Sequence, residues 1–398
     1  MSFFPDTPRC VILSFMTRAI PVFLSWVFLW VSFLNPPEAT AEPDLDKRIG
    51  QMIMVGFRGL VLTEDHPIVE DILKQRIGGV VLFDYDVPTR SYGRNIDSES
   101  QITNLTSFLQ KKAFIPLLVA IDQEGGQVNR LKEFYGFPPT VSQRLLGLSN
   151  LPQQTLDAAE KTAALLSKTG INLNLAPVVD LDINPRNPVI GRLERSFGKD
   201  PSIVIQHAMA TIEGHRRHGV LTTLKHFPGH GSSEGDTQKG HVDVTKQWSP
   251  IELEPFRHIV RQGKADCIMT AHLFNRRLDL KWPATLSALT ITGVLRGEIG
   301  FEGVVISDDL QMKAITDRYT PEAGIKRAIL AGVDILVFAN NSVYEEAAAA
   351  RAVHTIKEMI RKGELSENRI NVSWRRIMTL KERLGKKSER RLAHLPFT

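Results

Sequence analysis

The chain has few cysteines and little excess charge. Its 398 residues include only two cysteines, Cys10 and Cys267, and Cys10 falls in an N-terminal region that we expect to be removed. Cys267 would then be alone, which excludes a disulfide within the chain. The 49 Lys and Arg residues against 44 Asp and Glu residues give a formal charge of only +5. No nucleic-acid motif accompanies this charge, so nothing indicates a nucleic-acid partner.

Long apolar runs are also scarce, and the main one lies near the N-terminus. Ala19–Leu34 follows Arg18 and precedes the small residues Ala39-Thr40-Ala41. A basic start, an apolar middle and an A-x-A end predict a secretory signal peptide over residues 1–41, with Met16 as an alternative true start. The other interpretation is an uncleaved membrane anchor, but the run is shorter than the roughly 20 residues of a spanning helix.

The remaining residues, 42–398, are expected to form one exported domain, periplasmic or secreted. Their number fits a single large α/β barrel, which usually has about 250 residues plus insertions. No composition break or low-complexity linker marks a second domain. We expect a monomer that contacts a membrane only through an uncleaved signal.

Short apolar runs alternate with helical patterns along the whole domain. Each run has the length and composition of a buried parallel strand. The runs are Met52–Gly56, Gly79–Phe83, Leu117–Asp122, Asn172–Asp180, Leu221–Lys225, Cys267–Ala271, Val304–Ser307 and Asp334–Phe338. Helical patterns separate the later runs, for example over Leu156–Thr169, Ile203–His218 and Pro250–Gln262. This alternation predicts a closed (β/α)8 barrel of the TIM type and favours it over a doubly wound open sheet.

Two further helices are predicted after the last strand, within the same catalytic domain. The first spans Val343–Arg361 and ends at Gly363. The second is capped by Ser366 and carries Lys and Arg in its last turn before Gly385.

Polar side chains cluster where six of the eight predicted strands end. These clusters are Asp122-Gln123-Glu124, Asp180 with Asp182, Lys225-His226, His272, Asp308-Asp309 and Asn340-Asn341. In a barrel of this type the carboxyl ends of the strands meet at one face, where the chemistry occurs. The sequence therefore predicts one polar mouth lined by carboxylates and bases.

Glycoside cleavage, one reaction that such a mouth could carry, needs two carboxyl groups that flank the bond, or one carboxylate and another proton carrier. Asp308 and Asp309 are neighbours on a strand and point to opposite sides, so the second group must come from another loop. The glycine-rich segment after Lys225 is the obvious source. His226 and His230 could suggest a metal site, but the run between them is not helical and no third ligand follows at a clear spacing. Nothing in the sequence indicates that the protein requires a metal or an organic cofactor.

Four segments resemble the family-three β-N-acetylhexosaminidases. Lys225–Gly231, with the sequence KHFPGHG, is similar to the loop motif of that family, and so is Gly303–Leu310, with the sequence GVVISDDL. Ile121–Arg130 and Arg195–Gly198 fall where the family has sugar-contacting segments. The order of the four segments agrees, and the resemblance extends over about Leu45–Gly385.

The resemblance implies roles for individual residues. Asp308 would be the nucleophile that attacks the anomeric carbon. The residues that would hold the sugar hydroxyls are Asp122, Arg130, Arg195, Lys225 and His226.

The sequence departs from the family pattern at the acid/base. The family uses a histidine two residues after an aspartate that orients it, but here Asp236 is followed by Gln238, which cannot transfer a proton. His241 could take the role if the loop, flanked by Gly235 and Gly240, turns inward. Otherwise the enzyme works slowly or only on good leaving groups, or it has kept the sugar site and lost turnover. Glu234 is a further candidate donor that no spacing favours.

The expected function is that of a retaining exo-β-N-acetylhexosaminidase, which removes terminal N-acetylglucosamine from cell-wall or chitin-type glycans. One alternative is a catalytically impaired sugar-binding protein on the same barrel. The other is a β-glucosidase of the same family, although members of that kind usually draw their acid from a second domain.

Overall fold

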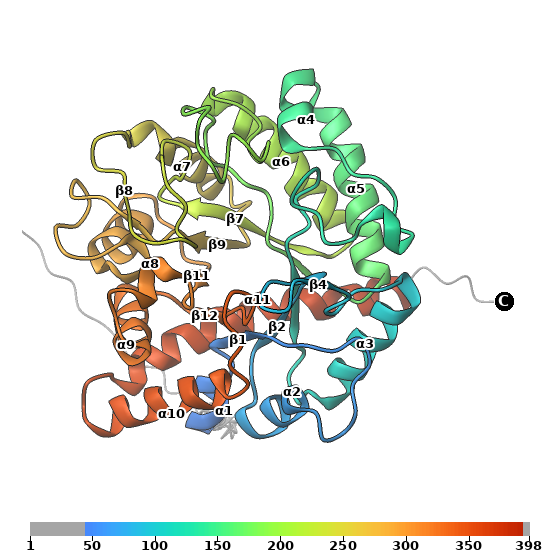
Figure 1. The fold of residues 1–398 in the computed structure, drawn as a ribbon, viewed down its shortest axis with the longest axis vertical. Helices are drawn as coiled ribbons and strands as arrows, with labels where there is room; N and C mark the ends of the chain where they lie inside the picture. The colour runs from blue at the N-terminus through green and yellow to red at the C-terminus, as the bar shows by residue number, and fades with distance from the viewer. Residues whose placement is uncertain (1–43, 393–398) are drawn as a thin grey trace, which may run out of the picture. The chain divides into compact units, whose positions relative to one another are not determined.

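The computed structural model describes residues 44–392, so the signal peptide predicted over residues 1–41 lies outside them. Eight parallel strands close into a barrel in the order β1-β12-β11-β9-β7-β6-β5-β2 (Figure 1). The strands are β1 (Ile53–Gly56), β2 (Gly79–Leu82), β5 (Leu118–Ile121), β6 (Leu173–Asn174), β7 (Leu221–Phe227), β9 (Cys267–Thr270), β11 (Val304–Asp309) and β12 (Ile335–Phe338). The predicted closed barrel is confirmed, and the open sheet is excluded.

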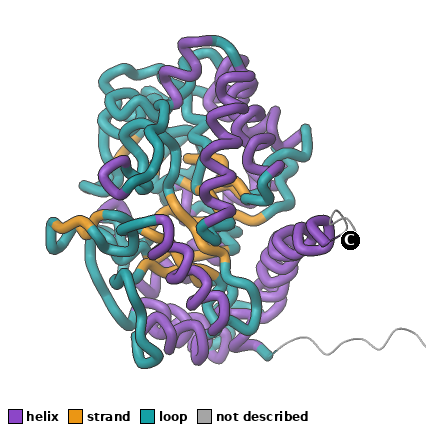
Figure 2. The backbone as a smooth tube through the Cα atoms, turned by 90° about the vertical axis from the view of Figure 1, so that its right-hand side faces the viewer, coloured by secondary structure: helices purple, strands orange, loops and turns teal. Residues whose placement is uncertain are grey.

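Helical elements surround the barrel in both ribbon views (Figures 1 and 2). In chain order they are α1 (Leu45–Gly50), α2 (Pro67–Glu70), the π-helical η1 (Asp71–Gln75), α3 (Glu99–Lys112), the 3-10 turn η2 (Glu133–Tyr135), α4 (Gln143–Ser149), α5 (Pro152–Lys168), α6 (Pro201–Arg217), the 3-10 turn η3 (Pro250–Leu253), α7 (Glu254–Arg261), the 3-10 turn η4 (Ala284–Leu286), the π-helical η5 (Leu289–Glu298), α8 (Lys313–Thr316), α9 (Pro321–Ala331), α10 (Ala348–Arg361) and α11 (Glu367–Leu392). Within residues 44–392, no helix is both long enough and apolar enough to cross a membrane.

Two small sheets lie outside the barrel. β3 (Tyr85–Asp86) pairs antiparallel with β4 (Ser91–Tyr92). β8 (Val242–Asp243) pairs parallel with β10 (Leu273–Phe274). Both arise from segments that follow barrel strands, so they add structure to the end of the barrel where the strands finish.

The sequence places most strands correctly but overestimates β6. That strand was expected over Asn172–Asp180, yet only Leu173–Asn174 pair as a strand. Pro177 has no N–H with which to continue the ladder. Beyond it, Val178 forms only an isolated bridge to Lys225. The neighbouring β7 extends two residues further than predicted, to Phe227.

The predicted C-terminal helices need two corrections. The helix expected from Val343 starts only at Ala348, because the Asn340 side chain holds the preceding loop by bonding to both backbone groups of Glu345. The helix expected to stop before Gly385 continues to Leu392. One interior glycine costs a helix only about 1 kcal/mol, which is too little to end it.

α11 covers the amino end of the barrel. The buried Lys381 on this helix donates to Gln51 Oε1 at 2.6 Å and to the Gly78 carbonyl at 2.7 Å, beside the starts of β1 and β2. The pKa of Lys381 is lowered to about 7 by burial. Figure 1 shows α11 passing behind the strands, so that view looks onto the opposite, carboxyl end.

Candidate active site

A buried lysine lies at the centre of the barrel mouth. Lys225 lies two residues before the end of β7, and its side chain is only 2% exposed. Its ammonium group lies 2.7 Å from Asp122 Oδ1 and 2.7 Å from Glu124 Oε1, both of which follow β5. Removing an ammonium ion from water is costly unless opposite charges surround it. The two carboxylates supply that compensation, so β5 and β7 together define the floor of the mouth.

Glu124 also binds Arg195 through two hydrogen bonds. The guanidinium donates to Oε2 at 2.8 Å and to Oε1 at 2.7 Å. Burial opposes ionisation of Glu124, but Arg195 and Lys225 outweigh it and hold the pKa of Glu124 below its ordinary value. The same balance, with Lys225 and Arg130 as the cations, lowers the pKa of Asp122. Both carboxyl groups are therefore ionised at neutral pH.

His226 is oriented by a second buried carboxylate. Its Nδ1 lies 2.7 Å from Asp180 Oδ2, and Asp180 also accepts the backbone N–H groups of His226 and His230. On the other side of the ring, Arg195 donates to Nε2 at 3.3 Å. An arginine can only donate, so Nε2 accepts and Nδ1 carries the proton toward Asp180. This fixes the plane and the tautomer of the imidazole.

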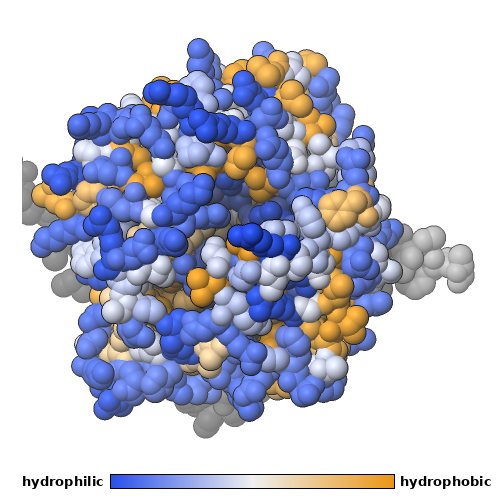
Figure 3. Space-filling model, viewed as in Figure 1, coloured by the Kyte–Doolittle hydropathy of each residue, from blue (hydrophilic) through white to orange (hydrophobic). Residues whose placement is uncertain are grey.

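Arg130 extends the network to the end of β2. Its guanidinium lies 3.5 Å from Asp122 Oδ2 and 4.0 Å from Asp84 Oδ1. Asp84 follows β2, is buried, and also pairs with Lys132. The predicted sugar-binding residues are thus brought together, since Asp122, Arg130, Arg195, Lys225 and His226 form one chain of ion pairs and hydrogen bonds. Figure 3 shows a hydrophilic hollow in the face that carries this end of the barrel.

Asp308 and Asp309 occupy different surroundings at the end of β11. Asp308 is half-buried, accepts the Asp309 backbone N–H at 2.8 Å, and raises the pKa of His272 against the larger effect of burial. Asp309 instead is buried and accepts the N–H groups of Ala339 and Gln311.

The loop that was expected to carry the acid is held away from an Asp–His pairing. Asp236 Oδ1 accepts the Gln238 backbone N–H at 2.9 Å, and its other oxygen lies 3.5 Å from Lys239. The Gln238 side chain is exposed. His241 is also exposed and its ring lies 5.4 Å from that of Phe274, on the β8–β10 side of the loop. Within the described loop, no hydrogen bond joins His241 to Asp236.

Two glycines of the KHFPGHG run allow close packing against neighbouring segments. A Cβ atom at Gly231 would lie 1.7 Å from the Leu181 carbonyl oxygen. Gly229 has φ +115°, and a Cβ there would lie 2.5 Å from that of Glu252. Larger residues at these positions would displace the backbone that presents His226.

The pair His226 and His230 has partners other than a metal. His230 Nδ1 lies 2.8 Å from Ser233 Oγ, and burial lowers the pKa of His230 to about 4. No group of three or more His, Cys, Asp or Glu side chains among the described residues could hold a metal ion.

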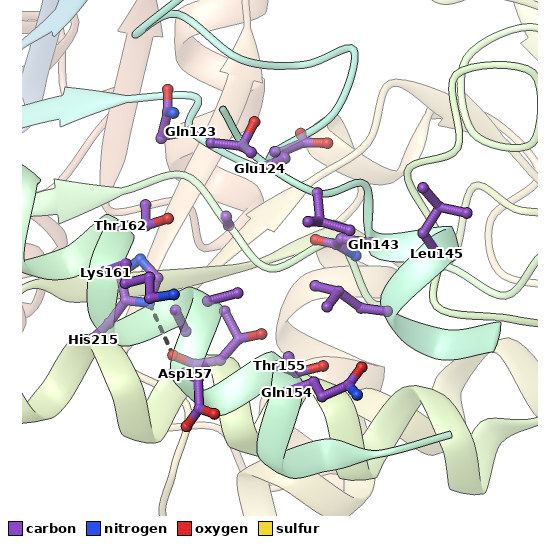
Figure 4. A pocket seen from close by; sticks show the side chains of 18 of the residues that line it. Gln123, Glu124, Gln143, Leu145, Gln154, Thr155, Asp157, Lys161, Thr162 and His215 are labelled. Atoms are coloured by element: carbon purple, nitrogen blue, oxygen red, sulfur yellow. Dashed lines mark hydrogen bonds between the residues drawn. The ribbon is translucent and has the colours of Figure 1, made fainter. Parts of the chain in front are cut away.

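A large cavity lies beside this network. It has a volume of about 660 Å³ and extends between α5 and the segment that leads into α4 (Figure 4). Gln123, Glu124 and His215 line its inner part. Asp308 and Lys225 do not line it. Glu124 therefore lies between the cavity and the charged mouth.

Glu124 and Asp180 are the partners that sequence reasoning left without a role. A usable signal existed for Glu124, because residues two apart on an extended strand end share a side, as Asp122 and Glu124 do. Gln123 points elsewhere and closes its own loop by accepting the backbone N–H groups of Arg130 and Leu131. For Asp180 the sequence indicated only that it lies at the end of a predicted strand.

Known proteins resemble the chain over most of its length. The model of the glycosyl hydrolase family 3 N terminal domain matches residues 44–380. The chain belongs to glycosyl hydrolase family 3. Beta-hexosaminidase A of Pseudoalteromonas piscicida is 30% identical over an alignment of 406 residues, gaps included. The alignment covers 90% of this chain and 65% of that protein. The beta-hexosaminidase of Tolumonas auensis is 37% identical over 270 residues, which cover 67% of this chain and 76% of that protein.

Solved structures of family 3 agree with the fold. The β-N-acetylglucosaminidase of a Paenibacillus species superposes with a TM-score of 0.79 at 33% identity, covering 86% of this chain and 63% of that one. The β-N-acetylhexosaminidase of Beutenbergia cavernae gives a TM-score of 0.77 at 29% identity, covering 86% and 99%. The chain thus spans under two thirds of some relatives, at 65% and 63%, and nearly all of another. The resemblance noted from the sequence motifs is confirmed.

The first prediction concerns Glu124. Glu124→Gln leaves Lys225 with one carboxylate and Arg195 with none, and breaking a buried ion pair from one side costs about 3–5 kcal/mol. We expect a loss of unfolding free energy of this order in urea titrations. The matched control is Glu64→Gln, which removes an exposed pair with Lys112 and should cost under about 1 kcal/mol. Equal losses for the two variants would contradict a buried network.

The second prediction concerns Asp309. Burial raises the pKa of Asp309 from 3.8 to about 7, so the folded state binds this proton more tightly than the unfolded chain. The stability it contributes is complete below about pH 4 and is lost as the pH rises through 7. Asp309→Asn keeps the acceptor for Ala339 and Gln311. Its unfolding free energy relative to that of the parent should rise by about 1–3 kcal/mol between pH 5 and pH 8, because only the parent loses this stabilisation. Parallel stability curves in urea from pH 5 to 8 would refute the assignment.

Proposed function

We propose that the protein is a retaining exo-β-N-acetylhexosaminidase that removes terminal N-acetylglucosamine from cell-wall or chitin-type glycans. The observation that carries this proposal is the arrangement of Asp308, a half-buried carboxylate at the end of β11, on the same barrel end as the Asp122–Lys225 network. The family membership and the names of the relatives support the sugar class. The N-terminal signal motif supports export, and hence a substrate outside the cytoplasm.

In the proposed first step, an oxygen of Asp308 attacks the anomeric carbon while the bond to the leaving oxygen breaks. The leaving oxygen takes up a proton, and a covalent glycosyl-enzyme remains. Water then attacks the same carbon from the vacated face and releases Asp308, so two inversions give net retention. The backbone N–H of Asp309 donates to Asp308 and orients it for attack.

The charged network provides sites for the hydroxyl groups of the sugar. Asp122 accepts hydrogen bonds, whereas Arg130 and Lys225 donate them, so hydroxyl groups find both kinds of partner. The Asp122 side chain is 18% exposed and that of Arg130 25%, which leaves part of each available to a ligand. These groups are held by each other before the sugar arrives, so binding costs little reorganisation.

The weak point of the mechanism is proton delivery to the leaving group. Gln238 cannot supply a proton, and Asp236 is engaged with the backbone of its own loop. Partial desolvation of the otherwise exposed His241 ring lowers its pKa, and Arg318 lowers it further, which favours the neutral ring. Turnover then depends on inward movement of His241 or on leaving groups that depart without protonation.

The second candidate function is a sugar-binding protein with impaired catalysis. Gln238 is the observation that favours it, because the substitution removes the acid without touching the residues that would bind the sugar. Binding without turnover of any glycoside would select this function over the first.

The nucleophile is tested by replacing each aspartate of the β11 pair. Asp308→Ala should lower turnover of p-nitrophenyl N-acetylglucosaminide by about 10⁴-fold and abolish covalent trapping by a fluorinated N-acetylglucosaminide, because the attacking oxygen is gone. Asp309→Asn, at a side chain that accepts backbone N–H groups of Ala339 and Gln311, should retain activity within about tenfold. Mass spectrometry of the trapped protein reads out the result. Trapping that survives in Asp308→Ala and disappears in Asp309→Asn would show that the nucleophile is misassigned.

The proton donor is tested on two leaving groups. The parent should cleave nitrophenyl glycosides measurably and natural disaccharides poorly, since an aryl alcohol of low pKa needs little protonation. Gln238→His should restore the Asp236–His pairing and raise the rate on disaccharides by about 10²-fold.

His241→Ala separates the two routes for the proton. Loss of disaccharide turnover in this variant would show that His241 has replaced the missing acid. If neither Gln238→His nor His241→Ala changes the rate on disaccharides, neither position delivers the proton and this account of the loop is wrong.

A further inference from the structure

Four aromatic rings form a connected cluster at the rim of the mouth. Tyr85 and Tyr92 come from the β3–β4 hairpin, and Phe134 and Tyr135 come from η2. Neighbouring ring centroids lie 4.9, 5.1 and 4.2 Å apart along the series. Tyr92 is 58% exposed and Phe134 is 61% exposed. We call these four residues the rim platform, and Figure 2 shows its hairpin standing out from the barrel at the left.

Hydrogen bonds of Tyr135 and Asp86 hold the rim platform in place. Tyr135 Oη accepts the Gly93 N–H at 3.1 Å and donates to the Asp84 carbonyl at 3.3 Å. In the hairpin, Asp86 accepts two hydrogen bonds from Arg58, at 2.7 and 3.1 Å. Aromatic rings that remain exposed on an anchored support are typical of binding surfaces, since ordering them on binding costs little entropy.

The platform is continuous with the charged network of the mouth. Lys132 lies 5.5 Å from the centre of the Tyr92 ring and pairs with Asp84. Arg130 lies next to Asp84 and reaches Asp122, as described above. Asp84 Oδ1 and Arg130 Nε are buried and lack a hydrogen-bond partner among the described residues. Polar atoms without a hydrogen-bond partner therefore lie between Asp122 and the exposed rings.

We propose that the rim platform is a second sugar subsite. It binds a further pyranose ring of a linear glycan whose end residue occupies the Asp122–Lys225 site, and the proposal rests on the function proposed above. A pyranose ring has an apolar C–H face and a polar edge. Tyr92 and Phe134 offer apolar surface to the face, and Lys132 offers a charged donor to the edge.

The size of the platform favours a sugar over a protein partner. A stable protein interface needs about 800 Å² from each side. Two exposed rings supply at most about 150–250 Å² each, which suits one or two sugar rings.

The test compares ligands of different length on an inactive background. Asp308→Asn protein is titrated by calorimetry with N-acetylglucosamine and with its β-1,4-linked trimer. The trimer should bind at least about tenfold more tightly than the monomer, as one stacked ring would provide. Adding Tyr92→Ala or Phe134→Ala should remove most of that advantage and leave monomer affinity within about twofold. Tyr92→Trp keeps an aromatic face and should retain the tighter binding of the trimer.

The matched control is Phe114→Ala. Phe114 is 75% exposed and precedes β5, at the opposite end of the barrel, so its removal should leave both affinities unchanged. Equal binding of monomer and trimer by the background protein overturns the subsite and leaves the proposed function standing. The same holds if Tyr92→Ala weakens both ligands equally. Failure of the background protein to bind either ligand overturns the proposed sugar site as well.

Discussion

The buried ammonium group of Lys225 is the constraint on which the mouth depends. It can stay in the barrel only because Asp122 and Glu124 lie at hydrogen-bonding distance, and they do so because closure of the barrel brings the ends of β5 and β7 to one rim. Glu124 in turn fixes Arg195, and Arg195 contacts His226. One charge balance thus orders side chains from three segments that are distant in the sequence.

The architecture could be predicted because every barrel strand is buried and reads as a short apolar run. The errors in the predicted bounds of β6 and α11 have local causes, which the apolar pattern does not indicate. Pro177 ends pairing in β6 although the residues around it are apolar. Gly385 resembles a stop signal, but a lone glycine costs a helix only about 1 kcal/mol, and α11 continues through it to Leu392. Strand identity survives such errors because burial, and not local propensity, decides it.

The site could be predicted only as far as strand ends and family motifs allow. Asp122, Lys225, His226 and Asp308 were expected to converge. Ion pairs and hydrogen bonds link the first three through Glu124 and Arg195, and Asp308 lies at the same end of the barrel. Which carboxylate pairs with which cation depends on contacts between strands, so the partnership of His226 with Asp180 had no sequence signal. The place of His241 beside Phe274 is also a tertiary matter, since β10 lies far from that loop in the chain.

The residues proposed to bind the sugar lie apart from the loop position at which the family carries its acid. The network around Lys225 is buried, and each of its members stabilises the others, so a substitution there costs folding free energy as well as affinity. Gln238 is exposed on a loop, and a substitution at such a position changes stability by less than about 0.5 kcal/mol. On the proposed function, an acid could therefore be lost from the loop without loss of the barrel or of the proposed sugar site. For the same reason, Gln238→His should alter catalysis without altering the fold.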